Sequence, residues 1–214
     1  MKFSVKKLVL ISMLAAIAYI IVALVRIPVV LFLQYEPKDV IITVGGFLLG
    51  PMTSFVISLI VSLLEMVTIS QTGPIGCLMN LLSTCAFSCV AAYVYKSHHT
   101  LKGAVWGLLL GSVFMTTVML LWNWLITPLY MGVSRQVVEG MLLSAFLPFN
   151  LLKAGLNTAL TLALYKPLAS TLRRTGLIPK SNSTARKAPW GVWLLSAGLL
   201  LTCVLLWLVL QGKL

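Results

Sequence analysis

The sequence predicts an all-α integral membrane protein: a bundle of six helices followed by one further transmembrane helix. Two observations support this fold class. Of the 214 residues, 60% are hydrophobic and 9% are charged, and the mean hydropathy is +1.04. Apolar runs also recur at lengths near the roughly 20 residues that cross a bilayer. A soluble domain carries about a quarter charged residues, so the composition excludes a soluble enzyme, a secreted disulfide scaffold and a disordered regulator.

The helices follow one another with clear boundaries. The first apolar run, 8–25, follows three lysines and continues past the point where a signal peptide would be cleaved, so we expect a retained helix that ends before Pro28. A short second segment at 40–50 is rich in glycine and stops at Pro51. Further spans are expected at 52–70, 75–95, 103–126 (bounded by Thr127-Pro128), 140–165 (kinked or opened by Pro148) and 190–210. This divides the chain into a six-helix domain (1–168), a basic cytoplasmic linker (169–189) and an additional helix (190–214).

The charged residues indicate an orientation. Lys and Arg number 16 against 4 Asp and Glu, and most of the basic residues fall on the cytoplasmic side if the N-terminus is placed there. We therefore expect a multi-pass protein of a bacterial cell membrane with a cytoplasmic N-terminus. No stretch interleaves basic and aromatic residues as a nucleic-acid groove does, so no nucleic-acid partner is expected.

Three polar residues in the sixth span point to a binding site. Asn150, Lys153 and Asn157 are three and four residues apart and therefore share one helix face. A lysine at the centre of a bilayer costs about 2.5–3.5 kcal/mol on insertion scales, so this position requires a reason. An ammonium and two amides could recognise carbonyls or hydroxyls of a ligand. The alternatives are that the lysine snorkels to the interface or that the amides join neighbouring helices.

A second candidate lies at the end of the fifth span, where Asn123 is flanked by Trp122 and Trp124. Two indoles and an amide could line a pocket for a flat aromatic ligand, or form an ordinary interfacial aromatic belt. Asn80 is a comparable buried amide in the fourth span. Glu65 in the third span is expected to pair with a cation or a polar loop, in either a structural or a binding role.

Catalytic and metal chemistry find no support in the sequence. The four cysteines form no C-x-x-C pair, the two histidines are adjacent in one loop, and no phosphate-binding glycine loop with a lysine occurs. We therefore expect no enzyme activity, no metal and no resident cofactor.

Several segments resemble a known family. Pro128-Leu129-Tyr130 and the run from Leu147 to Gly155 (LPFNLLKAG), together with Gly45–Pro51 (GGFLLGP) and Pro74–Asn80 (PIGCLMN), are similar to the riboflavin-specific substrate-binding subunits (S components) of energy-coupling-factor (ECF) vitamin transporters. The resemblance covers about residues 5–168 in order. It implies a six-helix protein that captures a vitamin from outside, and the helix at 190–210 is an addition to that plan.

The resemblance also implies partners and roles for residues. Family members associate with a transmembrane coupling subunit and two ATP-binding subunits. Their flavin-contacting Asn and Asn-x-x-Lys correspond to Asn123, Asn150 and Lys153. Their small residues on the first helix, which contact the coupling subunit, correspond to Ser12 and Ala16, with serine in place of the usual alanine.

The resulting hypothesis is uptake of riboflavin, which is the transported substrate. The isoalloxazine would stack among four aromatic side chains, and the loops at 27–39 and 127–139 would control access. Those aromatic candidates are Trp122, Trp124, Tyr130 and Phe149. The sparse cations favour riboflavin over its phosphate. Two alternatives stay open: an S component for another vitamin such as pantothenate or folate, and a membrane scaffold without a ligand.

Overall fold

The computed structural model describes residues 5–31, 33–70, 72–174 and 190–211, except for the side chains of 172–174 and 192. Within these residues it contains eight α-helices, one π-helical turn and one β-hairpin. In chain order they are α1 (Val5–Leu24), β1 (Ile27–Val30), β2 (Leu33–Tyr35), α2 (Lys38–Leu49), α3 (Pro51–Thr68), α4 (Gly73–Ser97), α5 (Leu101–Met131), α6 (Arg135–Met141), η1 (Leu142–Phe146, π-helical), α7 (Leu147–Arg174) and α8 (Trp190–Leu210).

The membrane-protein fold is confirmed. Among the described residues, six helical segments are long and apolar enough to cross a bilayer: α1, α3, α4, α5, the continuous α6–α7 segment and α8. α2 has 12 residues and spans only about 18 Å at 1.5 Å per residue, less than a bilayer core. It lies inside the bundle, packed against α1, α3, α4 and α7. With the short α2 included, the six-helix bundle and the additional C-terminal helix are both present.

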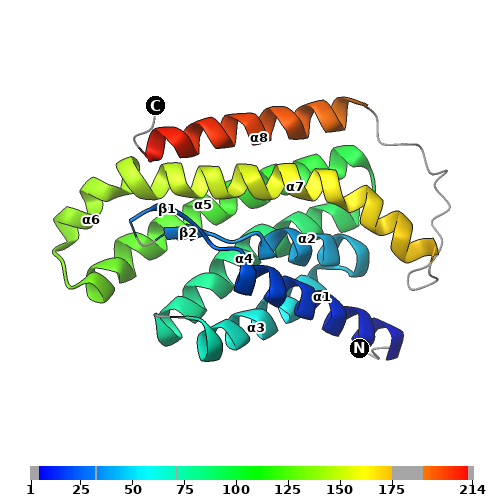
Figure 1. Cartoon of the computed structure of the whole chain (residues 1–214), viewed down its shortest axis with the longest axis horizontal. Coiled ribbons are helices and arrows are strands. Elements are labelled where there is room, and N and C mark those ends of the chain that lie inside the picture. The colour runs from blue at the N-terminus through cyan, green and yellow to red at the C-terminus, as the bar shows by residue number, and fades with distance from the viewer. Residues whose placement is uncertain (1–4, 32, 71, 175–189, 212–214) are drawn as a thin grey trace.

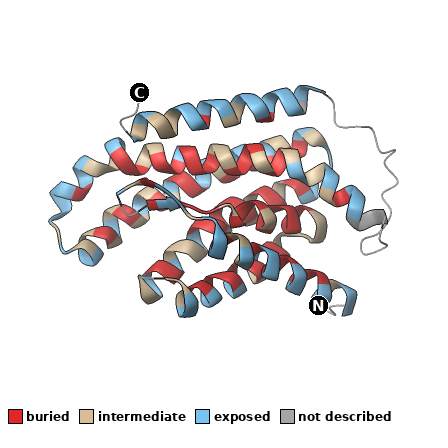
Figure 2. Cartoon of the chain, viewed as in Figure 1, coloured by how far each residue is buried: buried red, intermediate tan, exposed pale blue. Residues whose placement is uncertain are grey.

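Figure 1 shows that the helices run roughly along one long axis, with α8 beside α7 at the edge of the bundle. The start of α1 and the end of α7 lie at one end of the molecule, and the β-hairpin and α6 lie toward the other. Figure 2 shows that the exposed residues lie on the outward faces of the helices. Many of them are apolar, such as Leu8 on α1 and Val113 on α5, which suits a lipid environment. Many buried residues are polar instead, among them Thr43, Ser58 and Thr116.

Glycines allow a close contact between α4 and α5. A Cβ on Gly107 or Gly111 would lie 2.6 Å from the backbone carbonyl oxygen of Ala91 or Phe87 on α4. Small residues at four-residue spacing allow backbones to approach this closely in lipid. Elsewhere a glycine serves a turn: Gly50, with φ of 101°, joins α2 to α3, and Pro51 starts α3 at a position where no amide donor is needed.

Three expectations about element boundaries were wrong. The fifth helix does not stop before Pro128 but continues to Met131, because a proline in the last turn removes only one helical hydrogen bond there; the helix ends at Gly132, which is left-handed. The segment expected as an open loop at 27–39 folds into the β1–β2 hairpin and the first turn of α2. The second expected loop, 127–139, consists of the end of α5, a short turn and most of α6.

The sixth span is longer than expected. It begins at Arg135 as α6, passes through the π-helical turn η1 and continues as α7 to Arg174. Pro148 is the second residue of α7, directly after the π-helical turn. Because the helical segment is continuous from Arg135, the proline does not open it, and that alternative was wrong. The domain boundary placed at 168/169 lies within α7, and most of the expected linker, 175–189, lies outside the described residues.

The additional helix α8 packs on α7 and reaches the hairpin. A Cβ on Gly155 of α7 would come within 2.6 Å of the Cys203 sulfur of α8, so the glycine permits the close approach. At its C-terminal end, α8 places Leu206, Trp207 and Leu210 against the apolar cluster that contains hairpin and α7 residues.

Candidate functional site

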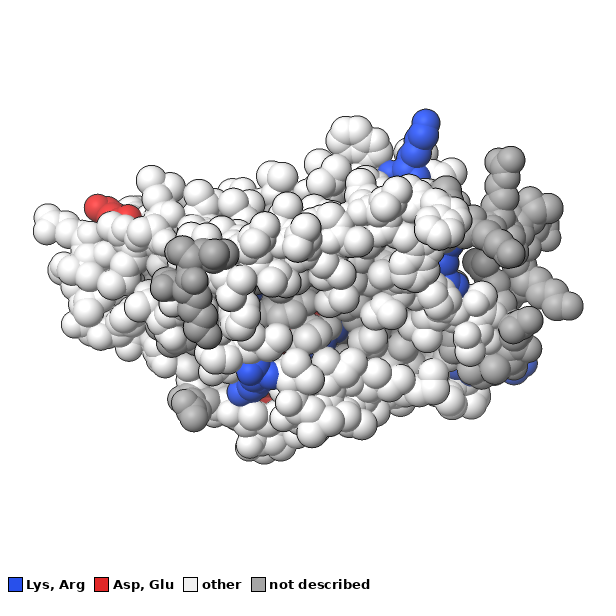
Figure 3. Space-filling model, turned by 45° about the horizontal axis from the view of Figure 1, so that its top comes forward, with Lys and Arg blue, Asp and Glu red and all other residues white. Residues whose placement is uncertain are grey.

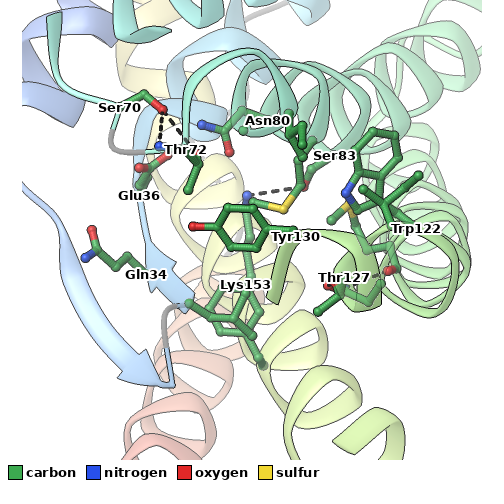
Figure 4. Close-up of a pocket in the computed structure, with 18 of the residues that line it drawn as sticks. Gln34, Glu36, Ser70, Thr72, Asn80, Ser83, Trp122, Thr127, Tyr130 and Lys153 are labelled. Atoms are coloured by element: carbon green, nitrogen blue, oxygen red, sulfur yellow. Dashed lines mark hydrogen bonds between the residues drawn. The ribbon is translucent and has the colours of Figure 1, made fainter. Parts of the chain in front are cut away.

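A cavity of about 550 Å³ lies at the hairpin end of the bundle, opposite the start of α1. Figure 4 shows the side chains that converge on it from the hairpin, the α3–α4 turn, α4, α5 and α7. Its volume lies within the roughly 300–1,000 Å³ typical of small-molecule sites. Its walls mix aromatic, aliphatic, amide and hydroxyl side chains, and it is lined by Arg26, Leu33, Gln34, Glu36, Ile69, Ser70, Thr72, Ile75, Gly76, Met79, Asn80, Ser83, Met119, Trp122, Asn123, Ile126, Thr127, Tyr130, Phe149, Asn150 and Lys153.

Most of the residues predicted from the sequence meet in this cavity; Trp124 and Asn157 do not line it. Those that line it are Asn80, Trp122, Asn123, Tyr130, Phe149, Asn150 and Lys153. Trp124 points away from the cavity, donates from Nε1 to Glu139 at 3.0 Å and lies under the guanidinium of Arg135. Trp122 and Trp124 are two positions apart on a helix, so both indoles cannot face the same side.

Lys153 is held by a buried ion pair. Its Nζ lies 3.1 Å from Oδ2 of Asp39 on α2. It also donates to the hydroxyl of Ser83 at 3.2 Å, a hydrogen bond drawn in Figure 4. Asp39 itself is fully buried and also accepts from Thr84 at 2.7 Å and from Asn157 at 3.2 Å. The lysine therefore does not snorkel; a carboxylate compensates its charge at the cavity wall.

The amide of Asn157 extends this network behind the cavity, where it does not line the wall. Its Oδ1 accepts from the Tyr35 hydroxyl of the hairpin at 3.1 Å. Burial raises the pKa of Tyr35, and the nearby Asp39 carboxylate raises it further, so the hydroxyl stays protonated and remains a donor. Of the expected polar stripe on α7, Asn150 and Lys153 face the cavity, whereas Asn157 joins helices, as the structural alternative proposed.

A second ion cluster joins the hairpin to three helices. Lys38 of α2 donates to both carboxylate oxygens of Glu65 on α3, at 2.5 and 2.6 Å, and pairs with Glu36 at 2.7 Å. Arg26, after α1, lies 3.4 Å from Glu36, and Asn80 of α4 donates to Glu65 at 2.8 Å. From the sequence, Glu65 was expected to pair with a cation or a polar loop, and the cation is Lys38. Lys38 was expected in an outer loop, but its side chain is buried.

Charges around the cavity balance. The cations Arg26, Lys38 and Lys153 face the carboxylates of Glu36, Asp39 and Glu65, which are three of the four acidic residues in the chain. Figure 3 shows a largely uncharged face, with Lys and Arg gathered at the end opposite the hairpin and in a hollow of the surface. The site thus offers directional donors and acceptors with almost no net charge.

The two cavity asparagines are fixed in orientation by their own helices. Asn123 donates to the Met119 carbonyl at 2.7 Å and accepts from Thr127 at 2.9 Å, and Asn150 donates to the Phe146 carbonyl at 2.8 Å. An amide has two N–H donors and an acceptor oxygen with two lone pairs, so these bonds use only part of its capacity. Both amides are therefore preorganised to bind a polar edge of a ligand.

Sequence reasoning missed Asp39, Glu36 and Lys38. All three fall in the segment 27–39, which was expected to be an outer loop before the apolar run at 40–50. One signal was present: acidic residues are so scarce in this chain that a pair at 36 and 39 needs cationic partners in a membrane protein. The identity of those partners depends on helices that meet only in the folded chain.

Comparison with known proteins finds a family and relatives that this chain resembles. A family model, "ECF transporter, substrate-specific component", matches residues 6–165. The riboflavin transporter RibU of Staphylococcus aureus (strain TCH60) is 28% identical over 178 residues, covering 79% of this chain and 93% of that protein. The riboflavin transporter FmnP of Bacillus subtilis (strain 168) is 29% identical over 161 residues, covering 70% of this chain and 84% of that protein.

A solved structure of the S component of a bacterial ECF transporter has the same fold. It superposes with a TM-score of 0.67 at 28% identity and covers 79% of this chain and 98% of that one. The residues matched by the family model include every side chain that lines the cavity and exclude α8.

Proposed function

The chain belongs to the substrate-specific components of ECF transporters, and we propose that its cavity captures riboflavin for uptake. The observation that carries the proposal is the cavity itself, in which a lysine and two preoriented amides face an aromatic wall. Riboflavin combines a flat aromatic ring, one edge of carbonyls and ring nitrogens, and a chain of hydroxyls. A site for it needs this mixture of surfaces.

The polar edge of the ring suits the α5 and α7 side of the cavity. Lys153 has three N–H donors, of which Asp39 and Ser83 take two. Its third donor, together with the amides of Asn123 and Asn150, would meet the carbonyls and ring nitrogens. Trp122 and Phe149 offer flat faces on which the ring would stack.

The ribityl hydroxyls suit the opposite side. There the hairpin contributes Gln34, and the α3–α4 turn and α4 contribute Ser70, Thr72 and Asn80. These groups donate and accept hydrogen bonds without carrying charge, as a chain of alcohols requires.

The charge balance favours riboflavin over its phosphate. A phosphate binds well where cations are available to it, but Arg26, Lys38 and Lys153 are each already paired with a carboxylate. Binding a phosphate would bring negative charge beside Glu36 and Asp39 without a new counter-charge.

Orientation and partners follow as part of the proposal. With a cytoplasmic N-terminus the cavity opens outside, where it would collect the vitamin. Uptake would then depend on a transmembrane coupling subunit and two ATP-binding subunits. Ser12 and Ala16 lie exposed on the lipid side of α1, four residues apart, where small side chains let another helix approach closely.

The test is a titration of the purified full-length chain in detergent, following quenching of riboflavin fluorescence. We expect saturable quenching by this chain, competition by unlabelled flavin analogues, and no competition by thiamine, pantothenate or folate. Trp122→Leu should weaken binding severalfold through lost ring contact. The matched variant Trp106→Leu, at an exposed position outside the cavity, should bind like the wild type.

If folded protein does not quench riboflavin fluorescence at any concentration tested, the flavin hypothesis is rejected. Binding of one of the other vitamins would then indicate a different S component. Binding of none of them would favour the scaffold.

A further inference from the structure

The end of α8 contacts the strand that borders the cavity. Trp207 donates from Nε1 and Gln211 donates from Nε2 to the same acceptor, the carbonyl oxygen of Pro28 in β1, at 3.4 and 3.2 Å. The two side chains are four residues apart and so share one face of the helix end. Leu206 and Leu210 pack beside them against the cluster that includes Val29 and Leu33 of the hairpin.

The hairpin needs such support. It is a two-stranded sheet, so β1 pairs with β2 on one edge only, and an isolated hairpin is marginally stable at best. The outer edge of a strand presents unpaired backbone groups. Pro28 has no N–H, so its carbonyl is the only polar backbone group that it can present, and α8 supplies the donors for it.

The same hairpin forms one wall of the cavity. Pro28 lies opposite Gln34 in the strand register, and Gln34, Leu33 and Glu36 line the cavity. Leu33 and Gln34 lie on β2, whose sheet partner is β1, so a shift of β1 would displace these two side chains from the cavity wall. Because α8 lies outside the residues that the family model matches, the support is an addition to the common six-helix plan.

We propose that Trp207 and Gln211 are positioning residues for ligand capture: they hold β1 against the bundle and thereby keep the hairpin wall of the cavity in place. Neither residue lines the cavity. They act on a ligand only through the strand, by lowering how often the hairpin detaches and so slowing ligand release. The part of this inference that concerns release rests on the proposed function. The part that concerns the hairpin does not.

The first experiment measures the hairpin without any ligand. Hydrogen–deuterium exchange is followed in the full-length protein in detergent for wild type, Trp207→Phe, Gln211→Glu and the double variant. Phenylalanine keeps an aromatic ring without the N–H, and glutamate keeps the length of the side chain without the donor. We expect amides of residues 27–35 to exchange about fivefold faster for each lost bond.

Two controls separate positioning from general stability. Trp193→Phe changes a half-exposed tryptophan at the other end of α8 and should leave the hairpin unchanged. Gln211→Lys restores a donor and should return exchange toward the wild-type rate. Unchanged exchange in the double variant, or an equal acceleration in α2–α4, would overturn the proposal.

The second experiment uses riboflavin as the probe. Stopped-flow dissociation from the double variant should be severalfold faster than from the wild type and from Trp193→Phe. A dissociation rate equal to that of the wild type would refute the link to ligand release. If the wild type itself binds no riboflavin, the proposed function fails, and the exchange experiment still decides whether α8 holds the hairpin.

Discussion

The ion pair between Lys153 and Asp39 leads to the sharpest prediction about stability and binding. The two charged atoms lie 3.1 Å apart, and the side chains are 7% and 0% exposed. At an effective dielectric constant near 20 their gross attraction is about 5 kcal/mol, which offsets the cost of burying both charges. Removing one partner leaves the other buried and uncompensated, which typically costs about 3–5 kcal/mol.

The perturbation is a cycle of Lys153→Met, Asp39→Asn and the double variant. Asparagine keeps the shape of the aspartate, and its oxygen can still accept from Thr84. Its NH2 would then face the Asn157 amide that donates to Asp39, so Asp39→Asn also removes that hydrogen bond. For a chain of this length, 3–5 kcal/mol corresponds to a fall of about 6–20 °C in melting temperature for Lys153→Met. The double variant, which buries no unpaired charge, should recover most of that loss.

The assay combines thermal unfolding in detergent with riboflavin titration of each variant. Lys153 lines the cavity and Asp39 does not, so the double variant should be folded yet bind riboflavin about 10- to 150-fold more weakly, the value of a hydrogen bond from a charged donor. If Lys153→Met has the same melting temperature as the wild type, the ion pair does not stabilise the fold. If the double variant binds like the wild type, Lys153 does not contact the flavin.

Two further predictions concern helix contacts. Gly107→Ala should lower the stability of the bundle by about 1–3 kcal/mol, because the added methyl would press on the Ala91 carbonyl. The control is Gly198→Ala on α8, where nothing lies within 4 Å of the added methyl. Equal melting temperatures of the two variants would contradict the close α4–α5 packing. Ala16→Leu should reduce riboflavin uptake in cells that carry the whole transporter but leave binding to the purified chain intact. The control Ala197→Leu, at an exposed position on α8, should alter neither uptake nor binding. Unchanged uptake by Ala16→Leu would show that this face of α1 does not contact the coupling subunit.

Local patterns in the sequence predicted those parts of the fold that depend on local physics. Apolar runs identified each membrane helix, since a bilayer imposes a minimum length. Helical spacing correctly placed Asn150 and Lys153 on one face of α7, toward the cavity. The same spacing argument, applied to Trp122 and Trp124, would have shown that only one of the two indoles can line the pocket.

Contacts between distant segments could not be predicted in this way. Asn157 and Asp39 are 118 residues apart, and no local pattern identifies one as the partner of the other. Lys38 and Glu36 were placed in a loop because charges usually mark loops in membrane proteins; here they are buried because Glu65 and Arg26 compensate them. The hairpin was missed because its strands are short and because the outer edge of β1 is bonded by a side chain of the distant helix α8.

The most direct test of the central claim is a structure of the full-length chain with riboflavin bound. The account predicts the isoalloxazine in the cavity at the hairpin end, stacked on Trp122, with its polar edge within hydrogen-bonding distance of Lys153 and Asn150. A flavin bound elsewhere on the protein, or a cavity that stays without flavin at saturating concentration, would contradict it.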